Sequence, residues 1–102
     1  MRPSFAVEES VRAFGMNIRT ARLRRRLPQA MVAERAGISL NTLSKIENGD
    51  CGVAIGNVAA VLQALGLGTP LSLVAATESD ETGLLLEERR LPRRARLPKK
   101  SE

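Results

Sequence analysis

The stretch LPQAMVAERAGISLNTLSKIENG, residues 27–49, decides the fold of this chain. Its pattern predicts two short helices around a tight turn, over about residues 28–36 and 40–48. Proline at the start of the first helix suits a turn in which no backbone N–H is needed. Gly37 can take the left-handed conformation that ends a helix, and the Ser39 hydroxyl can cap the next one.

Helix, short turn and helix is the plan of the helix-turn-helix motif, in which the second helix enters the DNA major groove. In that second helix, Leu43 and Ile46 are spaced to face inward. Asn41, Lys45 and Asn48 share the opposite face at spacings of four and three residues. Asparagine can pair with adenine, and lysine with guanine or a phosphate. An ordinary solvated face has the same composition, and for an isolated helix that interpretation would be preferred.

The composition of the chain limits the classes of function that it can have. The chain has 102 residues and a net charge of +5, which makes a polyanion a plausible partner, although a generic basic surface is equally compatible. Histidine, tryptophan and tyrosine are absent, so we expect no enzyme, no cofactor and no metal site. The single cysteine, Cys51, cannot form an internal disulfide and fits a reducing cytoplasm. No apolar run has membrane length, so no membrane partner is expected.

Helical periodicity extends to both sides of the motif. Residues 1–7 have no periodic pattern and are expected to form a flexible arm, with a first helix starting near residues 8–10. Residues 55–65 are apolar almost all round, which predicts a helix that is buried on several sides or packed on a partner. A fifth helix is expected from Pro70 to about residue 76. The sequence therefore predicts an all-α, five-helix domain over residues 8–76.

Particular side chains are assigned to its core. Spacing places the following apolar residues inside: Val11, Phe14, Ile18, Ala21, Met31, Val32 and Ala36. Arg22 lies on the same stripe as Ile18, where an unpaired charge would be unfavourable. Glu47, on the inner side of the helix over residues 40–48, is its natural partner. A surface position for both side chains is the alternative.

The last quarter of the chain changes in composition. Acidic residues surround Leu84, Leu85 and Leu86, and residues 89–100 then hold seven Arg or Lys and no acid. We expect residues 77–102 to be a mostly disordered, flexible basic tail, with a short strand or helix through the leucines on dimerisation or partner binding as the alternative. The basic run is either solvated or a DNA contact.

Residues 14–67 resemble the Xre/Cro-CI, or lambda-repressor-like, helix-turn-helix domain. The resemblance rests on FGMNIRTAR, Gln29, Val32-Ala33, the AGIS turn, TLSKIENG and VLQALGL. It implies a lambda-repressor-like five-helix fold that binds double-stranded DNA, commonly as a homodimer on a palindromic operator. The residues it implies for base readout are Ser39, Leu40, Asn41, Thr42 and Lys45. Gln29 matches the glutamine that contacts the DNA backbone, and Arg22 with Glu47 matches a recurrent internal ion pair.

Further DNA-backbone contacts are expected from Arg19, Arg24, Arg25 and Asn48, because positive or polar groups there can face phosphates. Three departures from the family pattern weaken parts of this assignment. Pro28 replaces the usual Ser or Thr cap, and Leu40 replaces a commonly polar reader. The loop over residues 50–52 lacks the basic residues often found on phosphates.

Two functions follow from these observations. The first is a dimeric, sequence-specific transcriptional regulator, a repressor, acting in the cytoplasm. The second comes from a weaker resemblance of residues 49–98 to HipB-like antitoxins, which accompany HipA-like toxin kinases and repress their own operons. For the homodimer, the expected interface is formed by apolar residues of the last two helices: Val58, Val61, Leu62, Leu71 and Val74, with Leu84–Leu86 added.

Overall fold

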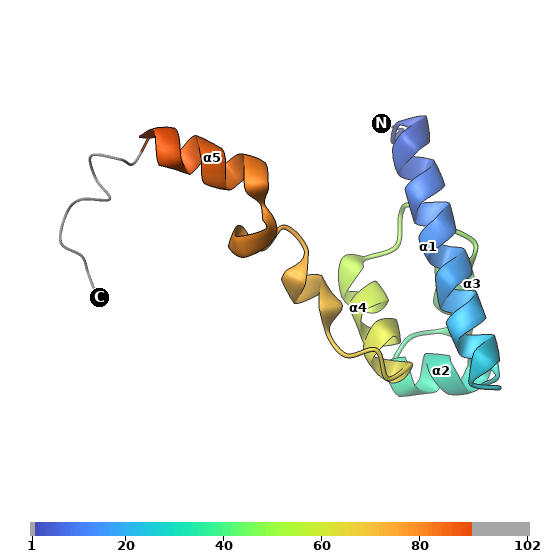
Figure 1. Ribbon diagram of the computed structural model, residues 1–102. Coiled ribbons are helices and arrows are strands. Elements are labelled where there is room, and N and C mark those ends of the chain that lie inside the picture. Colours follow the sequence, from blue (N-terminus) through green and yellow to red (C-terminus); the bar gives the residue numbers. More distant parts are fainter. Residues whose placement is uncertain (1, 91–102) are drawn as a thin grey trace. The chain divides into compact units, whose positions relative to one another are not determined.

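The computed structural model describes residues 2–90, and the fold of these residues is all-α, as predicted, with no strand among them (Figure 1). Its α-helices are α1 (Phe5–Arg24), α2 (Gln29–Ala36), α3 (Leu40–Glu47), α4 (Ile55–Ala64) and α5 (Glu81–Arg90). Two short 3-10 helices, Pro70–Leu73 and Thr77–Ser79, lie between α4 and α5. The chain divides into two compact units, one ending at Pro70 and one beginning at Leu71, whereas the sequence predicted a domain to residue 76.

The first unit holds the hydrophobic core. Within it, α1 packs on α3, α2 packs on α3 and α4, and α3 also contacts α4. The buried apolar side chains come from all four helices and the residue after α4: Ile18, Val32, Ala33, Leu43, Ile46, Val61, Leu62 and Leu65. Because each helix contributes at least one of them, removing apolar surface from water holds all four helices together.

The backbones of α1 and α3 approach each other closely. A Cβ placed on Gly15 would lie 2.5 Å from the carbonyl oxygen of Ile46 and 2.8 Å from that of Glu47. Just after α3, Gly49 has a φ of +81°, and a Cβ there would lie 2.7 Å from the Cα of Arg12. Glycine is therefore required at both positions, at Gly49 also for its left-handed backbone. These two contacts fix the spacing between α1 and the end of α3.

Local capping explains where the helices begin and end, and it corrects one prediction. The Ser4 hydroxyl accepts a hydrogen bond from the Val7 N–H at 3.2 Å, so α1 begins at Phe5 instead of near residues 8–10. Residues 5–7 consequently belong to the helix and not to a flexible arm. Gly37 ends α2 with a φ of +72°, as its position predicted. Pro28 is the N-cap of α2 and not its first helical residue, and no side chain caps that end.

Several expected core or interface positions differ in the structure. Met31 is 38% exposed, so it is not one of the core residues of α2. Val61 and Leu62, expected at a dimer interface, are instead buried in the first unit's own core. The nearly apolar α4 is thus explained by burial inside one chain at these two positions.

The second unit differs most from the expectation. The fifth helix expected from Pro70 to residue 76 is only a 3-10 turn that ends at Leu73. An α-helix forms later, at Glu81–Arg90, within the segment predicted to be a disordered tail; it runs through Leu84–Leu86, where the alternative interpretation placed a short strand or helix on dimerisation or partner binding. The Asp80 carboxylate accepts a hydrogen bond from the Gly83 N–H at 3.0 Å, which caps this helix. The basic stretch after residue 90 lies outside the described residues.

The close approach of α1 and α3 gives the first prediction. Gly15→Ala should lower the free energy of unfolding by about 1–3 kcal/mol, because the methyl group meets backbone carbonyls that cannot rotate away. Gly56→Ala is the matched control, since a Cβ at this other helical glycine meets nothing within 4 Å. It should raise stability by about 0.5–1 kcal/mol through helix propensity. Urea unfolding measures both; equal effects of the two changes would contradict the close approach.

Candidate nucleic-acid interface

The helix α3 is held at its start by a serine–threonine pair. The Ser39 hydroxyl accepts a hydrogen bond from the Thr42 backbone N–H at 3.0 Å and donates one to the Thr42 hydroxyl at 2.9 Å. On the inner side, Leu43 and Ile46 are buried in the core. The helix is therefore fixed at its N-terminal cap and along one face, and its other face is left for solvent or a ligand.

The outer face of α3 carries exposed polar side chains. Asn41, Lys45 and Asn48 are all exposed, Asn48 as the residue that caps the C-terminal end of the helix. Leu40 is exposed beside them, and Thr42 is half-buried. The spacing places these groups on one side of a helix that can enter a major groove, where amide and ammonium groups can reach base edges. We call Asn41, Lys45 and Asn48 the recognition face.

A buried ion pair lies directly behind this face and joins α1 to α3. Arg22 Nε donates to Glu47 Oε2 at 2.6 Å, and Arg22 Nη2 donates to Glu47 Oε1 at 3.0 Å. The two side chains are only 10% and 3% exposed. Two parallel hydrogen bonds from one guanidinium to one carboxylate are the strongest geometry available to such a pair.

The same two side chains also hold the segment between α1 and α2. Arg22 Nη1 donates to the carbonyl oxygen of Leu27 at 3.0 Å. Gln29 Nε2, at the first residue of α2, donates to Glu47 Oε1 at 3.0 Å. One carboxylate thus accepts three hydrogen bonds, from α1 and from α2. We call Arg22, Glu47, Gln29 and the Leu27 carbonyl the anchoring network.

The charge state of this network follows from its geometry. The hydrogen bonding of the Arg22 guanidinium to the Glu47 carboxylate raises the pKa of Arg22 above its ordinary value, and the negative charge of Glu47 adds to this, although burial alone would lower it. The guanidinium is therefore charged, since arginine does not lose its proton in proteins.

Arginines gather around the end of α1. Arg19, Arg24, Arg25 and Arg26 are all exposed. Arg25 Nη1 donates to the Ala21 carbonyl oxygen at 2.9 Å, so this guanidinium folds back on its own helix. Arg26 has a left-handed backbone with a φ of 55°, which turns the chain towards α2. Positive charge at a helix C-terminus is favourable in itself, so Arg24 and Arg25 stabilise the end of α1 independently of any ligand.

A small hollow of about 180 Å³ adjoins the recognition face, lined by Thr42, Lys45, Asp50, Gly52, Val53, Ala54 and Asn57. Asp50 Oδ1 accepts a hydrogen bond from the Gly52 N–H at 2.6 Å, which orders the loop after α3. The Asp50 carboxylate would repel a phosphate placed in the hollow. This charge agrees with the absence of basic residues from the loop and leaves Lys45 as the cationic group at this edge.

A family model described as a helix-turn-helix domain matches residues 13–75, which is more than half of the chain. The chain belongs to the helix-turn-helix family. The match covers most of α1 and all of α2, α3 and α4. A search of curated proteins and a search of solved structures each find no match.

Family membership supports DNA binding, and in the helix-turn-helix plan it is the second helix of the motif that enters the major groove. The match also confirms the resemblance found in the sequence at the level of the helix-turn-helix domain. Within residues 2–90, no helix is long and apolar enough to cross a membrane. The same residues contain no group of three or more side chains placed to hold a metal ion.

The structure places the sequence-predicted site residues in three groups. Gln29 bonds to Glu47 inside the anchoring network, the recognition face lies on the solvent side of α3, and Arg19, Arg24 and Arg25 are exposed on α1 and at its end. The sequence did not indicate that the Leu27 carbonyl and the Thr42 hydroxyl are engaged. A serine three residues before a threonine at a helix start was the available signal for the second contact, since an N-cap hydroxyl lies near that position.

The anchoring network gives the second prediction. Glu47→Ala should lower the free energy of unfolding by about 3–5 kcal/mol, because it leaves the Arg22 guanidinium buried without its partner. Glu9→Ala is the matched control: it breaks an ion pair of similar length, 2.7 Å to Arg12, whose side chains are about half exposed. It should change stability by less than about 1 kcal/mol. Thermal or urea unfolding compares them, and a Glu47→Ala protein as stable as the control would refute the network's structural role.

Proposed function

We propose that this protein is a transcriptional regulator that binds double-stranded DNA sequence-specifically, as a dimeric repressor on a palindromic operator. One observation carries the proposal: the polar recognition face of α3 is exposed, while Leu43, Ile46 and the anchoring network fix its opposite side. A rigid, outward polar helix in a helix-turn-helix protein is suited to the major groove. Its site of action would be the cytoplasm.

Base readout is assigned to the recognition helix. Asn41 and Lys45 are the main readers, because their amide and ammonium groups match the edges of adenine and guanine. Leu40 is assigned a contact with a thymine methyl group. Ser39 and Thr42 are assigned supporting contacts, since their hydroxyls already bond each other and have less capacity left for a base.

Contacts to the DNA backbone are assigned around the readers. Gln29, at the start of α2, is held by Glu47, so its position relative to α3 is fixed. Asn48 lies at the other end of the recognition face. Arg19, Arg24 and Arg25 supply positive charge from α1. Such contacts set the register of a protein on DNA, whereas base contacts set the sequence preference.

The short length of α3 favours a dimer. The recognition helix α3 has eight residues and can reach only a few base pairs. Two copies related by a two-fold axis double the contacts on a palindrome, with half-sites about one helical turn apart.

The alternative function is that of a HipB-like antitoxin, which would bind a HipA-like toxin kinase and repress its own operon. It uses the same DNA-binding unit and requires one further protein contact. The exposed leucines Leu84–Leu86 are the described feature that favours such a contact. Co-purification with the kinase encoded by an adjacent gene would support this alternative.

Selection of bound sites from random DNA tests the proposed function and supplies the operator. With that operator, Asn41→Ala should weaken binding by about 1–3 kcal/mol and relax the base preference at one position in each half-site. Gln63→Ala, an exposed change in α4 away from the recognition face, should leave affinity and preference unchanged. A uniform loss of affinity across all sequences would place Asn41 on the backbone instead.

Salt dependence gives a separate prediction for the arginines of α1. The logarithm of the binding constant should fall linearly with the logarithm of salt concentration, with a slope of roughly −0.9 per phosphate contacted. Arg24→Gln should make that slope less steep by about 0.9 for each phosphate that the Arg24 guanidinium neutralises. Arg35→Gln in α2 removes the same charge away from the predicted contacts and should leave the slope unchanged. Identical slopes for both variants would exclude a phosphate contact by Arg24.

A further inference from the structure

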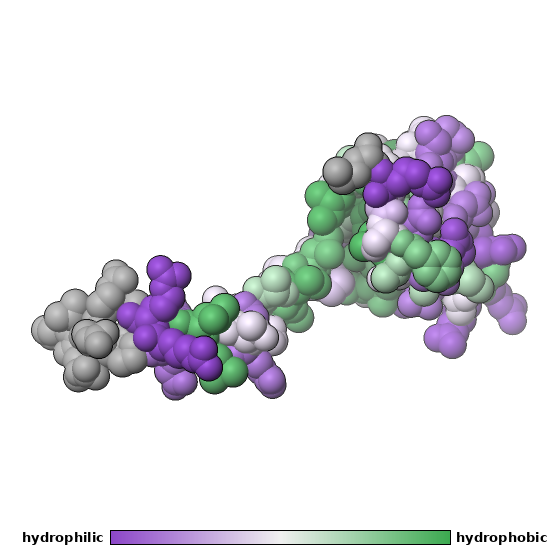
Figure 2. Space-filling model, turned by 90° about the horizontal axis from the view of Figure 1, so that it is seen from above, coloured by the Kyte–Doolittle hydropathy of each residue, from purple (hydrophilic) through white to green (hydrophobic). Residues whose placement is uncertain are grey.

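The described residues of the second unit form no core. None of the residues from 71 to 90 is buried; Leu71 is half-buried, and Leu73, Val74, Leu84, Leu85 and Leu86 are exposed. Figure 2 shows apolar side chains at the surface of this C-terminal segment beside charged ones. The helix α5 has ten residues, and an isolated helix shorter than about 12–15 residues is marginal in water. A partner that covers α5 would supply the missing burial.

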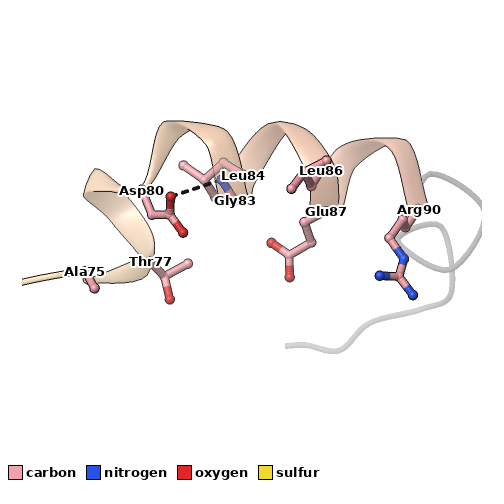
Figure 3. Close-up of a pocket in the computed structure, with 8 residues that line it drawn as sticks. All are labelled: Ala75, Thr77, Asp80, Gly83, Leu84, Leu86, Glu87 and Arg90. Atoms are coloured by element: carbon pink, nitrogen blue, oxygen red, sulfur yellow. Dashed lines mark hydrogen bonds between the residues drawn. The ribbon is translucent and has the colours of Figure 1, made fainter. Parts of the chain in front are cut away.

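One side of α5 borders an open groove. The groove has a volume of about 470 Å³ and is lined by Ala75, Thr77, Asp80, Gly83, Leu84, Leu86, Glu87 and Arg90 (Figure 3). Glu87 and Arg90 point to the same side of the helix in that view. The space where a Gly83 side chain would lie is occupied by the Asp80 carboxylate. Leu84 and Leu86 flank this side, whereas Leu85 does not line the groove.

Charged residues are unevenly distributed along this segment. Its start carries only acids, Glu78, Asp80 and Glu81, whereas its end carries Glu87, Glu88, Arg89 and Arg90. A parallel copy would place the acids of the two starts together, whereas an antiparallel copy places them near Arg89 and Arg90. The charge pattern therefore fits an antiparallel copy of the same helix.

We propose that α5 pairs with α5 of a second copy of this chain, antiparallel and groove to groove. Placing Asp80 opposite Arg90 of the second copy puts the two-fold axis level with residue 85. Leu84 then packs beside Leu84 of the second copy on one flank, and Leu86 beside Leu86 on the other. Leu85, about 100° around the helix from both, points away from the contact.

This inference deepens the proposed dimer, on which it rests, by assigning it an interface. Each helix is only about 15 Å long, so the contact is smaller than the roughly 1,200–2,000 Å² of a stable complex. We therefore expect the full chain to dimerise in the micromolar range without DNA.

The test compares neighbouring leucines in the full chain. Sedimentation equilibrium from roughly 1 to 300 µM gives the dimer dissociation constant. Leu86→Asp should raise it by about tenfold or more, because it places a carboxylate in the leucine contact. Leu85→Asp is the matched control, because Leu85 and Leu86 are similarly exposed, at 60% and 53%. It should leave the dissociation constant unchanged, since Leu85 points away from the contact. Equal effects of both substitutions, or a wild-type chain that stays monomeric throughout, would overturn the pairing.

Cross-linking tests the register. In a Cys51→Ser background, Leu84→Cys and Leu86→Cys should each oxidise to a covalent dimer faster than Leu85→Cys; equal rates for all three would overturn the antiparallel register. DNA binding separates this inference from the proposed function. If the Leu86→Asp protein dimerises more weakly but keeps its base preference within a half-site, both the pairing and the proposed function are supported. A dimer with the expected register that binds no DNA supports the pairing and refutes the regulator.

Discussion

The buried ion pair between Arg22 and Glu47 is the interaction on which the DNA-binding unit depends. Its three nitrogens and two oxygens join α1, the turn before α2, the first residue of α2 and the last residue of α3. Burying two charges is favourable only when each is well paired, and here every nitrogen of the guanidinium donates. A network of this kind therefore favours one arrangement of the three helices over its alternatives, in addition to what apolar burial contributes.

Close contacts of the backbone at two glycines complete this arrangement. Gly15 lets α1 lie directly on the carbonyls that end α3, and Gly49 lets the following turn lie on Arg12. Close-packed backbones leave little freedom for α3 to tilt or slide. The polar side chains on its outer face are thus carried on a rigid support, which is what a helix needs in order to present its side chains in a fixed arrangement to a ligand.

The two units illustrate different ways in which a small chain gains stability. The first unit buries apolar side chains from four helices, and its two buried charged side chains form an ion pair with each other. The second has local caps and turns but no buried side chain among its described residues. Local hydrogen bonds alone seldom hold ten helical residues, so apolar burial explains the stability of the first unit, whereas it does not explain that of the described residues of the second.

The sequence by itself determined the features that depend on neighbouring residues. The Ser39 cap, the left-handed Gly37, the inward Leu43 and Ile46 and the charged pair on an apolar stripe follow from spacing and residue type, since these interactions span few residues or one helix face. Only the tertiary structure decided that Met31 is exposed, that Val61 and Leu62 serve the chain's own core, and that Gln29 bonds to Glu47. These outcomes depend on how helices cross in space, and a helical repeat shows which face is apolar but not what covers it.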